Sequence, residues 1–255
     1  MPTPVLTLHS ALRTDVGRRD NNEDSLFASP RLAVVADGVG GASSGEVASR
    51  MVVDALIALD KRRLGEPLAA ELRQSVLEAN QRLRFVISCR PQHAGMASTL
   101  TTVALSDEGH YLVANIGDSR TYLLRAGRLR QLTRDQSLVQ ALLDQGAITT
   151  AQAREHPHRS VVLEALDGGH AEPQITVVAA RAGDRLLLCS DGLSDVVTDE
   201  QIAALLAAAD RDEAARRLVG AALDSGGRDN VSVVVADVLP TDDPGQGWWD
   251  IGPTA

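Results

Sequence analysis

Three apolar runs of the chain each end in an aspartate that has a glycine beside it. The segments are LAVVADG at 32–38, LLLCSDG at 186–192 and ANIGD at 114–118. Runs of this kind are typical of buried strands, and strand ends are where a rigid scaffold presents functional side chains. A glycine next to the carboxylate lets the backbone turn sharply and lets another group approach. Asp37, Asp118 and Asp191 are therefore candidates for one functional site.

Two further acidic stretches lie at turns. RRDNNED at 18–24 supplies Glu23 and Asp24, and GRDN at 227–230 supplies Asp229 just before another apolar run. A single strand-terminal aspartate is usually a turn former or a helix cap. Carboxylates that gather at the edge of one core repel each other strongly, and a bound cation would remove that repulsion.

The available ligands indicate which cation this would be. They are carboxylates and backbone carbonyls, and the sequence has neither a paired-cysteine motif nor a His-x-x-x-His spacing. This set favours Mg²⁺ or Mn²⁺ over zinc or copper. Two such ions about 3.5–4 Å apart would activate a water molecule and clamp the oxygens of an in-line displacement, as phosphoester hydrolysis requires. Arg18 or Arg19 would supply a cation for the phosphate oxygens.

The elements that position these residues are predicted to be mainly short strands. The β-branched or leucine-rich runs lie at 5–10, 32–36, 99–105, 110–116, 121–124, 128–132, 175–180, 185–190 and 231–238. Tight turns at 106–109 and 125–128 favour antiparallel sheets, because parallel pairs need longer crossovers. Helical patterns cover 47–60, about 67–87, 200–209 and 213–223. The chain is thus predicted to be an α+β domain whose helices pack outside a sheet core.

The segment 136–159 interrupts the series of strands. Its short helical patterns are broken by Gly146 and Pro157, and it lies between two of the carboxylate-bearing strand ends. We interpret it as an excursion over one rim of the sheets. The alternative is a connecting helical hairpin without a special role.

Composition narrows the class of protein. Of the 255 residues, 44% are hydrophobic and 23% are charged, as in ordinary soluble domains. No apolar run approaches the roughly 20 residues of a membrane span, and the N-terminus lacks signal-peptide features. The net charge of −9, without any block of Lys or Arg, argues against nucleic-acid or membrane binding. Cys89 and Cys189 lie far apart, which favours a cytoplasmic setting.

The order of these motifs resembles one family. RDNNED at 19–24, ADGVGG at 36–41, ANIGDSR at 114–120, LTRDQS at 132–137, EHPHRSVVLEALDG at 155–168, SDGLSD at 190–195 and GRDNVSVVV at 227–235 are the matching segments. Together they are similar to the metal-dependent Ser/Thr protein phosphatases, the protein phosphatase 2C family, in its compact bacterial form. No single motif is specific, but the order and spacing match over about residues 5–238.

The resemblance implies an αββα sandwich of two antiparallel sheets flanked by helical pairs. It divides the chain into one phosphatase catalytic domain at 1–240, with a flap at about 136–159, and a C-terminal tail at 241–255. It also implies two Mn²⁺ or Mg²⁺ ions in the catalytic core and a third, weaker site.

The resemblance assigns a role to each acidic residue of the core. Asp37 is similar to the carboxylate that bridges two metals, with the Gly38 carbonyl as a further ligand. Asp191 and Asp229 are similar to the remaining ligands of the first metal. Arg19 stands at the position that binds the substrate phosphate, so the catalytic set is Arg19, Asp37, Asp191 and Asp229.

The other assignments concern the second and third metals. Glu23 would hold water of the second metal, with Asp24 in support. Asp118 is similar to the residue that helps to bind the third metal, which it would share with Asp191. Ser160 stands where a polar residue sometimes completes that third site.

Two positions depart from the family pattern. Val39 stands where some members have a histidine that protonates the leaving alcohol, so a metal-bound water is the expected proton donor. Gln136 replaces a histidine that often precedes the serine of the flap motif.

The expected function is Mn²⁺- or Mg²⁺-dependent hydrolysis of phosphoserine and phosphothreonine in proteins, by a metal-activated water. The enzyme would be a cytoplasmic monomer that opposes a Ser/Thr kinase and acts on the targets of that kinase. One alternative is a phosphatase-like module that binds a phosphoprotein without hydrolysis, although such modules usually lack some metal carboxylates. Another is an enzyme with one dedicated target, such as an antagonist of an anti-sigma factor.

The tail GQGWWDIGPTA at 245–255 contains Trp248 and Trp249, the only tryptophans of the chain. We expect their rings to pack back onto the domain. The alternative is a docking segment for a partner.

Overall fold

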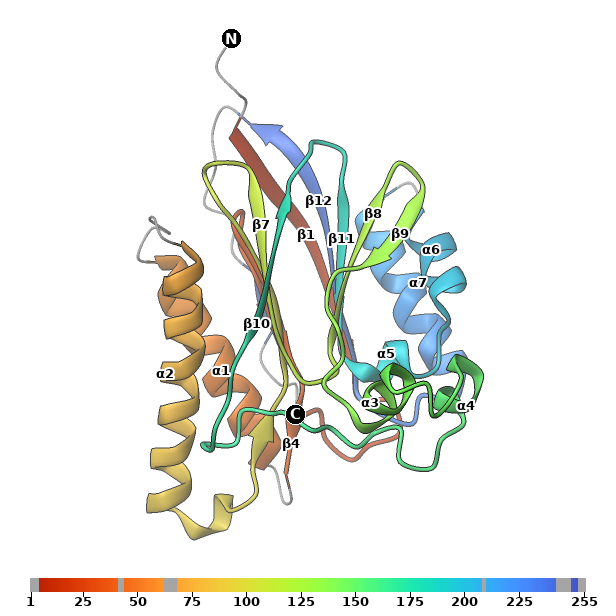
Figure 1. The fold of residues 1–255 in the computed structure, drawn as a ribbon. Helices are drawn as coiled ribbons and strands as arrows, with labels where there is room; N and C mark the ends of the chain where they lie inside the picture. The colour runs from red at the N-terminus through yellow and green to blue at the C-terminus, as the bar shows by residue number, and fades with distance from the viewer. Residues whose placement is uncertain (1–4, 41–43, 62–67, 208–209, 242–248, 252–255) are drawn as a thin grey trace.

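Two antiparallel sheets pack face to face, and helices cover the outer face of each sheet (Figure 1). The computed structural model describes residues 5–40, 44–61, 68–207, 210–241 and 249–251. Among the helices of these ranges, none is both long and apolar enough to cross a bilayer. The predicted αββα sandwich is confirmed.

The first sheet has five strands in the order β1-β12-β11-β8-β9. Their bounds are Val5–Asp15 for β1, Val231–Thr241 for β12, Arg185–Cys189 for β11, Arg120–Arg125 for β8 and Arg128–Gln131 for β9. All four neighbouring pairs are antiparallel.

The second sheet has six strands in the order β10-β7-β6-β3-β2-β13. They are β10 (Gln174–Ala179), β7 (His110–Ile116), β6 (Leu100–Leu105), β3 (Leu32–Ala36), β2 (Ser25–Ala28) and β13 (Trp249–Ile251). These pairs are antiparallel as well. A separate short ladder joins β4 (Gly38–Val39) to β5 (Ala97–Ser98).

Two groups of helices flank the sheets. The pair α1 (Ser44–Lys61) and α2 (Leu68–Cys89) covers the second sheet, and the turn η1 (Pro91–His93) follows it. The first sheet is covered by α5 (Asp191–Ser194), α6 (Asp199–Leu206) and α7 (Arg211–Asp224). Two short helices, α3 (Leu138–Asp144) and α4 (Thr150–Arg154), lie at one end of the sandwich (Figure 1).

Strand β3 shows why its sequence is apolar without alternation. Ala33 and Val35 pack between the two sheets, whereas Leu32, Val34 and Ala36 pack against α1 and α2. All five side chains are fully buried, because both faces of the strand are covered. Full burial of one valine or leucine side chain stabilises the fold by about 1.5–3 kcal/mol.

Most predicted elements are present, with differences at the ends. The predicted bounds of β3 and β7 match, but β1 continues five residues beyond position 10. It does so because it pairs with β12 along its whole length, from Val5–Thr241 to Asp15–Val231. The strands β2, β4, β5 and β13 were not predicted.

The predicted helices are also present where the structure describes them. Thr198 and Gln201 form a reciprocal capping box that opens α6, and Asp210 caps α7 through the backbone N–H of Glu213. The predicted end at 208–209 and the tryptophan at 248 lie outside the described residues. The backbone of 249–251 pairs with β2, so this part of the tail returns to the second sheet.

Candidate active site

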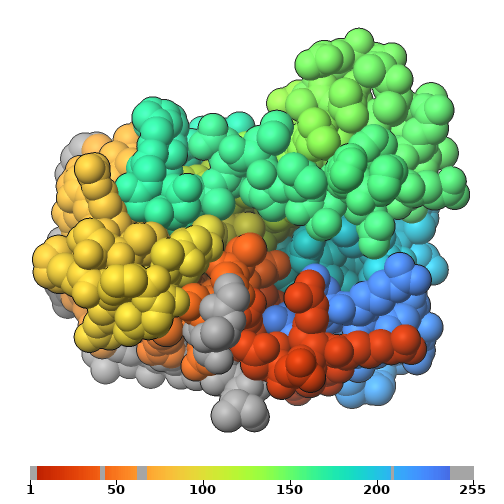
Figure 2. Space-filling model, turned by 90° about the horizontal axis from the view of Figure 1, so that it is seen from below, coloured from red at the N-terminus to blue at the C-terminus, as the bar shows by residue number. Residues whose placement is uncertain are grey.

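The acidic residues singled out from the sequence lie at one end of the sandwich. Asp37 follows β3, Asp191 opens α5 directly after β11, and Asp118 lies in the turn between β7 and β8. Seen from this end, red and orange N-terminal segments meet blue C-terminal segments beside the green segment that includes α3 and α4 (Figure 2). The fold therefore brings residues from distant parts of the sequence to one surface.

Asp37 is the centre of the carboxylate cluster. Burial raises the pKa of Asp37 well above its usual value, and the carboxylates of Asp24, Asp191, Asp118 and Asp229 raise it further, in that order. Such mutual effects require that the groups lie close together in a poorly solvated place. The structure thus gathers these five aspartates around the end of β3.

Asp118 and Asp191 form one side of this cluster. Burial, followed by the charges of Asp118 and Asp195, raises the pKa of Asp191 well above its usual value. Asp118 is only 7% exposed. Burial, together with the carboxylates of Asp135 and Asp195, raises the pKa of Asp118 to about 7. This side therefore holds more negative charge than the sequence motifs alone indicate.

Asp24 and Glu23 form the opposite side. Asp24 is fully buried and accepts a hydrogen bond from the Ser190 hydroxyl at 3.0 Å. Burial raises the pKa of Asp24 to about 6, and burial is also the main reason that the pKa of Glu23 is raised. The backbone carbonyl of Glu23 accepts from the N–H of Gly38, which ties this loop to the end of β3.

The glycines beside Asp37 and Asp191 share one structural reason. A Cβ atom on Gly38 would lie 2.1 Å from the carbonyl oxygen of Gly45, and one on Gly192 would lie 2.0 Å from that of Asn230. In both places another backbone segment occupies the space of a side chain. The repeated Asp-Gly pattern therefore reflects close backbone packing behind each carboxylate.

Asn230 holds two of the acidic loops together. Its side-chain oxygen accepts from the N–H of Glu23 at 2.9 Å, and its side-chain nitrogen donates to the carbonyls of Val16 and Asn21, each at 3.0 Å. It thereby fixes the loop of Arg19 and Glu23 beside Asp229. The GRDN motif is the sequence signal for this residue, although only Asp229 was selected from it.

Arg19 and Asp229 form an ion pair at the exposed edge of the cluster. The guanidinium donates to the Asp229 carboxylate at 2.6 Å, and the two side chains are 55% and 37% exposed. An exposed pair of this kind contributes little to stability. The Arg19 guanidinium is instead available to bind an incoming anion.

The donor chemistry of the cluster fits hard cations. Asp24 Oδ1 and Asp191 Oδ1 are buried and have no hydrogen-bond partner within the described residues. Buried, unpaired carboxylate oxygens are costly unless a cation compensates them, and Mg²⁺ and Mn²⁺ prefer such ligands. Over these same ranges, no three His, Cys, Asp or Glu side chains already surround one point as metal ligands do. The side chains would therefore turn to bind an ion, and Asp229 would do so from its contact with Arg19.

Two predicted positions lie at the surface. Ser160 is exposed in a turn at the end of the flap, and in the described part of the chain its hydroxyl makes no hydrogen bond. Val39 is 51% exposed, and its side chain has no proton to donate.

Sequence reasoning missed Thr99. The N–H of Asp37 donates to the Thr99 hydroxyl at 3.1 Å, and the N–H of Thr99 donates to the Asp37 carbonyl at 2.8 Å. The same hydroxyl lies 2.8 Å from the Ser119 hydroxyl, next to Asp118. Thr99 therefore connects the strand end at Asp37 to the strand end at Asp118. From the sequence, Thr99 is recognisable only as the first residue of a predicted strand.

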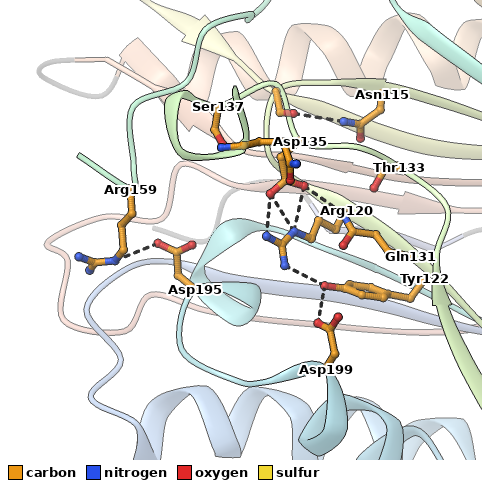
Figure 3. Close-up of polar contacts among 12 residues, drawn as sticks. Asn115, Arg120, Tyr122, Gln131, Thr133, Asp135, Ser137, Arg159, Asp195 and Asp199 are labelled. Carbon is orange, nitrogen blue, oxygen red and sulfur yellow. Dashed lines mark hydrogen bonds and ion pairs between the residues drawn. The ribbon is translucent and has the colours of Figure 1, made fainter. Parts of the chain in front are cut away.

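Asp195, the last residue of SDGLSD, is a further acidic side chain next to the cluster. It lies beside Asp118 and Asp191, and its carboxylate is 3.4 Å from the guanidinium of Arg159 at the end of the flap. The contact is drawn in Figure 3. The motif SDGLSD is the signal that marks this residue.

Comparisons with known proteins identify the family. The family model described as protein phosphatase 2C matches residues 13–222. The Serine/threonine protein phosphatase PstP of Mycobacterium tuberculosis is 47% identical over 243 residues, which cover 95% of this chain and 47% of that protein. The chain therefore spans about half the length of this relative. The Serine/threonine phosphatase stp of Listeria welshimeri is 36% identical over 90% of this chain and 96% of its own length.

A solved structure extends the similarity to the fold. The crystal structure of the catalytic domain of PstP in complex with two manganese ions matches with a TM-score of 0.87 at 46% identity. The match covers 92% of this chain and 99% of that one. The chain belongs to the protein phosphatase 2C family, the metal-dependent Ser/Thr protein phosphatases.

Proposed function

We propose that this chain hydrolyses phosphoserine and phosphothreonine in proteins and requires Mn²⁺ or Mg²⁺. The observation that carries the proposal is the cluster of carboxylates around Asp37, of which Asp24 and Asp118 are buried, with the exposed guanidinium of Arg19 beside it. The family membership and the manganese-containing structure of a relative support it.

The proposal gives each residue one task. Asp37, Asp191 and Asp229 would hold one ion, with the Gly38 carbonyl as a further ligand. Asp37 and Glu23 would serve a second ion, Glu23 through water, with Asp24 in support. Asp118 and Asp191 hold a third ion more weakly. Ser160, which is exposed in a turn at the end of the flap, would complete this third site.

When bound, the ions supply Lewis acidity that activates water and neutralises phosphate charge. The chain itself binds and orients the substrate. Arg19 donates to the phosphate oxygens after its contact with Asp229 is exchanged for one with the substrate, and this places the phosphorus over the carboxylates. Val39 cannot protonate the alkoxide of the leaving serine or threonine. The proton that the alkoxide takes up therefore comes from water.

The setting is part of the same proposal. Residues 1–240 act as one catalytic domain, with the flap at 136–159 beside the site, and the tail at 241–255 adds the edge strand β13 to the second sheet. The enzyme works as a cytoplasmic monomer, where Cys89 and Cys189 remain thiols, and it opposes a Ser/Thr kinase on shared phosphoproteins.

Metal-titrated hydrolysis of a phosphothreonine peptide tests the function. We expect phosphate release that rises with Mn²⁺, stops with excess chelator and returns with added metal. Asp191→Asn, whose size is unchanged, should retain the fold by circular dichroism and lose turnover. If the wild-type chain binds the peptide but releases no phosphate while the Listeria relative does so in parallel, the binding-module alternative is correct.

Arg19 offers a test of phosphate binding. Arg19→Ala should lower kcat/KM by about 10- to 100-fold, because a hydrogen bond to a charged group contributes about 1.5–3 kcal/mol. Arg18→Ala is the matched control, since Arg18 is also exposed and meets Gly227 through its backbone N–H. Steady-state kinetics should show a change below about threefold for this control. Equal losses in both variants would mean that the basic loop acts only through its general charge.

A further inference from the structure

The turn that carries Asp118 is held from one side by the first residue of the flap. The N–H of Gly117 donates to the side-chain oxygen of Gln136 at 2.8 Å, and the N–H of Gln136 donates to the Gly117 carbonyl at 2.9 Å. We call this reciprocal pair of hydrogen bonds the Gly117 clamp. Because Asp118 follows Gly117 directly, the clamp fixes the peptide from which its carboxylate extends.

The same turn is held from the other side by Thr99. Gly117 has a φ of +95°, and a Cβ atom there would lie 2.8 Å from the methyl group of Thr99. The Thr99 hydroxyl also contacts Ser119 at 2.8 Å and accepts from the N–H of Asp37 at 3.1 Å. The turn is therefore enclosed between the strand end at Asp37 and Gln136. Because the turn is packed on the Asp37 side, a displacement of Gln136 would also displace the Gly117–Asp118 peptide.

Gln136 is itself held through its neighbour Asp135. The Arg120 guanidinium donates to both oxygens of Asp135, from Nε at 2.9 and 3.0 Å and from Nη2 at 2.6 Å, and Asp135 is only 7% exposed. Arg120 also donates to the Tyr122 hydroxyl at 3.0 Å, which donates to Asp199 (Figure 3). A paired arginine of this kind is directional and hard to replace by solvent.

Backbone hydrogen bonds close the base of the flap beside Gln136. The N–H of Leu163 donates to the Gln136 carbonyl at 2.8 Å, and the N–H of Leu138 donates to the Val161 carbonyl at 2.9 Å. A cavity of about 270 Å³ is lined by α3 and α4 on one side and by Asp118 and Asp195 on the other. Gln136 therefore lies where the segment that lines this cavity meets the turn of Asp118.

We propose that Gln136 is a positioning residue that couples the flap to the cation site of Asp118. A displaced flap weakens the Gly117 clamp and turns the Asp118 carboxylate away, and an ion bound at Asp118 favours the closed flap by the same free energy. The inference rests on the proposed role of Asp118 in holding a third ion. It gives a function to Gln136, which stands where the family often has a histidine.

Direct Mn²⁺ binding to the whole chain tests the coupling without any turnover. Gln136→Met keeps the length of the side chain and removes the acceptor of the Gly117 N–H. In a calorimetric titration with Mn²⁺, the Kd of the weaker binding phase should rise by about 10-fold or more, as it does when other residues that orient a metal ligand are replaced. The Kd values of the tighter phases should not change. Hydrogen exchange at the Gly117 amide should accelerate by at least about 10-fold, because its acceptor is lost.

A rescue and a control separate positioning from a general disturbance. Gln136→His restores an acceptor nitrogen and should return the weak-phase Kd to within about threefold of the wild-type value. Gln140→Met changes another flap glutamine that lines the same cavity. Among the described residues its side chain hydrogen-bonds to Asp144 and not to the Gly117 turn, so this substitution should alter neither readout. The proposal is overturned if Gln136→Met leaves both readouts unchanged, if Gln140→Met shifts them equally, or if the wild-type chain shows no weaker phase. Phosphatase activity in the wild-type chain can be present in each of these cases, so the two proposals fail separately.

Discussion

Asp37→Asn is expected to abolish phosphopeptide hydrolysis and, in the metal-free protein, to raise the melting temperature. The partly buried Asp37 carboxylate lies among four other carboxylates, and desolvation together with their charges raises its pKa well above its usual value. Asparagine has nearly the same shape but no charge, so it removes the repulsion and also the proposed bridge between two ions. Turnover should fall by at least about a thousandfold, because a metal supplies several kcal/mol of charge stabilisation.

The stability part of this prediction is measured after chelation. A gain of about 1 kcal/mol raises the melting temperature of a protein of this size by about 2–4 °C. Added Mn²⁺ should stabilise the wild-type chain much more than the variant. Asp107→Asn is the control, because Asp107 is 74% exposed and paired with Arg31 at a distant turn. A variant that loses stability without metal, or that retains turnover, would contradict the central place given to Asp37.

The strands of this fold are readable from the sequence where both of their faces are buried. LAVVA predicts β3 with the correct bounds because every side chain of that strand packs against either the helices or the other sheet. The end of β1 was not predictable in the same way. Its last residues, Ala11–Asp15 in the sequence ALRTD, are strand only because β12 lies beside them. Pairing partners that are distant in the sequence decide such boundaries.

Short strands escaped prediction for a related reason. The four residues of β2 follow directly on the acidic loop, and β4 and β5 have two residues each. Such lengths carry no detectable period. β4 and β5 nevertheless place Gly38 opposite Ser98, which holds the loop behind Asp37.

For the candidate site, the sequence predicts the acid residues better than the residues that hold them. Asp37, Asp118 and Asp191 share a visible pattern at strand ends, and the order of the motifs indicates the family. The contacts of Thr99 and Asn230 arise only when distant segments meet. The GRDN motif marks Asn230 but not the residues that Asn230 binds, and the sequence around Thr99 indicates only the start of a strand. The role of Ser160 rests on its place in a motif alone and stays a prediction.

The tight backbone packing behind the carboxylates leads to a second large effect. Gly192→Ala is expected to lower the free energy of unfolding by about 2–3 kcal/mol, as overpacking of a close contact does. The new Cβ would lie 2.0 Å from the Asn230 carbonyl oxygen. That backbone cannot yield easily, because the Asn230 side chain is bound to Val16, Asn21 and Glu23. The displaced segment would carry Asp229 away from Asp191.

Gly220→Ala provides a matched comparison for this substitution. Both glycines are helical, but a Cβ on Gly220 meets no atom within 4 Å. Alanine there should stabilise the protein by about 0.5–1 kcal/mol through its helix propensity. Urea unfolding with and without Mn²⁺ measures both variants, and only Gly192→Ala should also lose the stabilisation that Mn²⁺ adds. If both substitutions raised stability, the packing of Asn230 against Gly192 would be loose, and the glycine after Asp191 would need another explanation. The opposite signs expected here follow because a glycine is required only where another backbone occupies the place of its side chain.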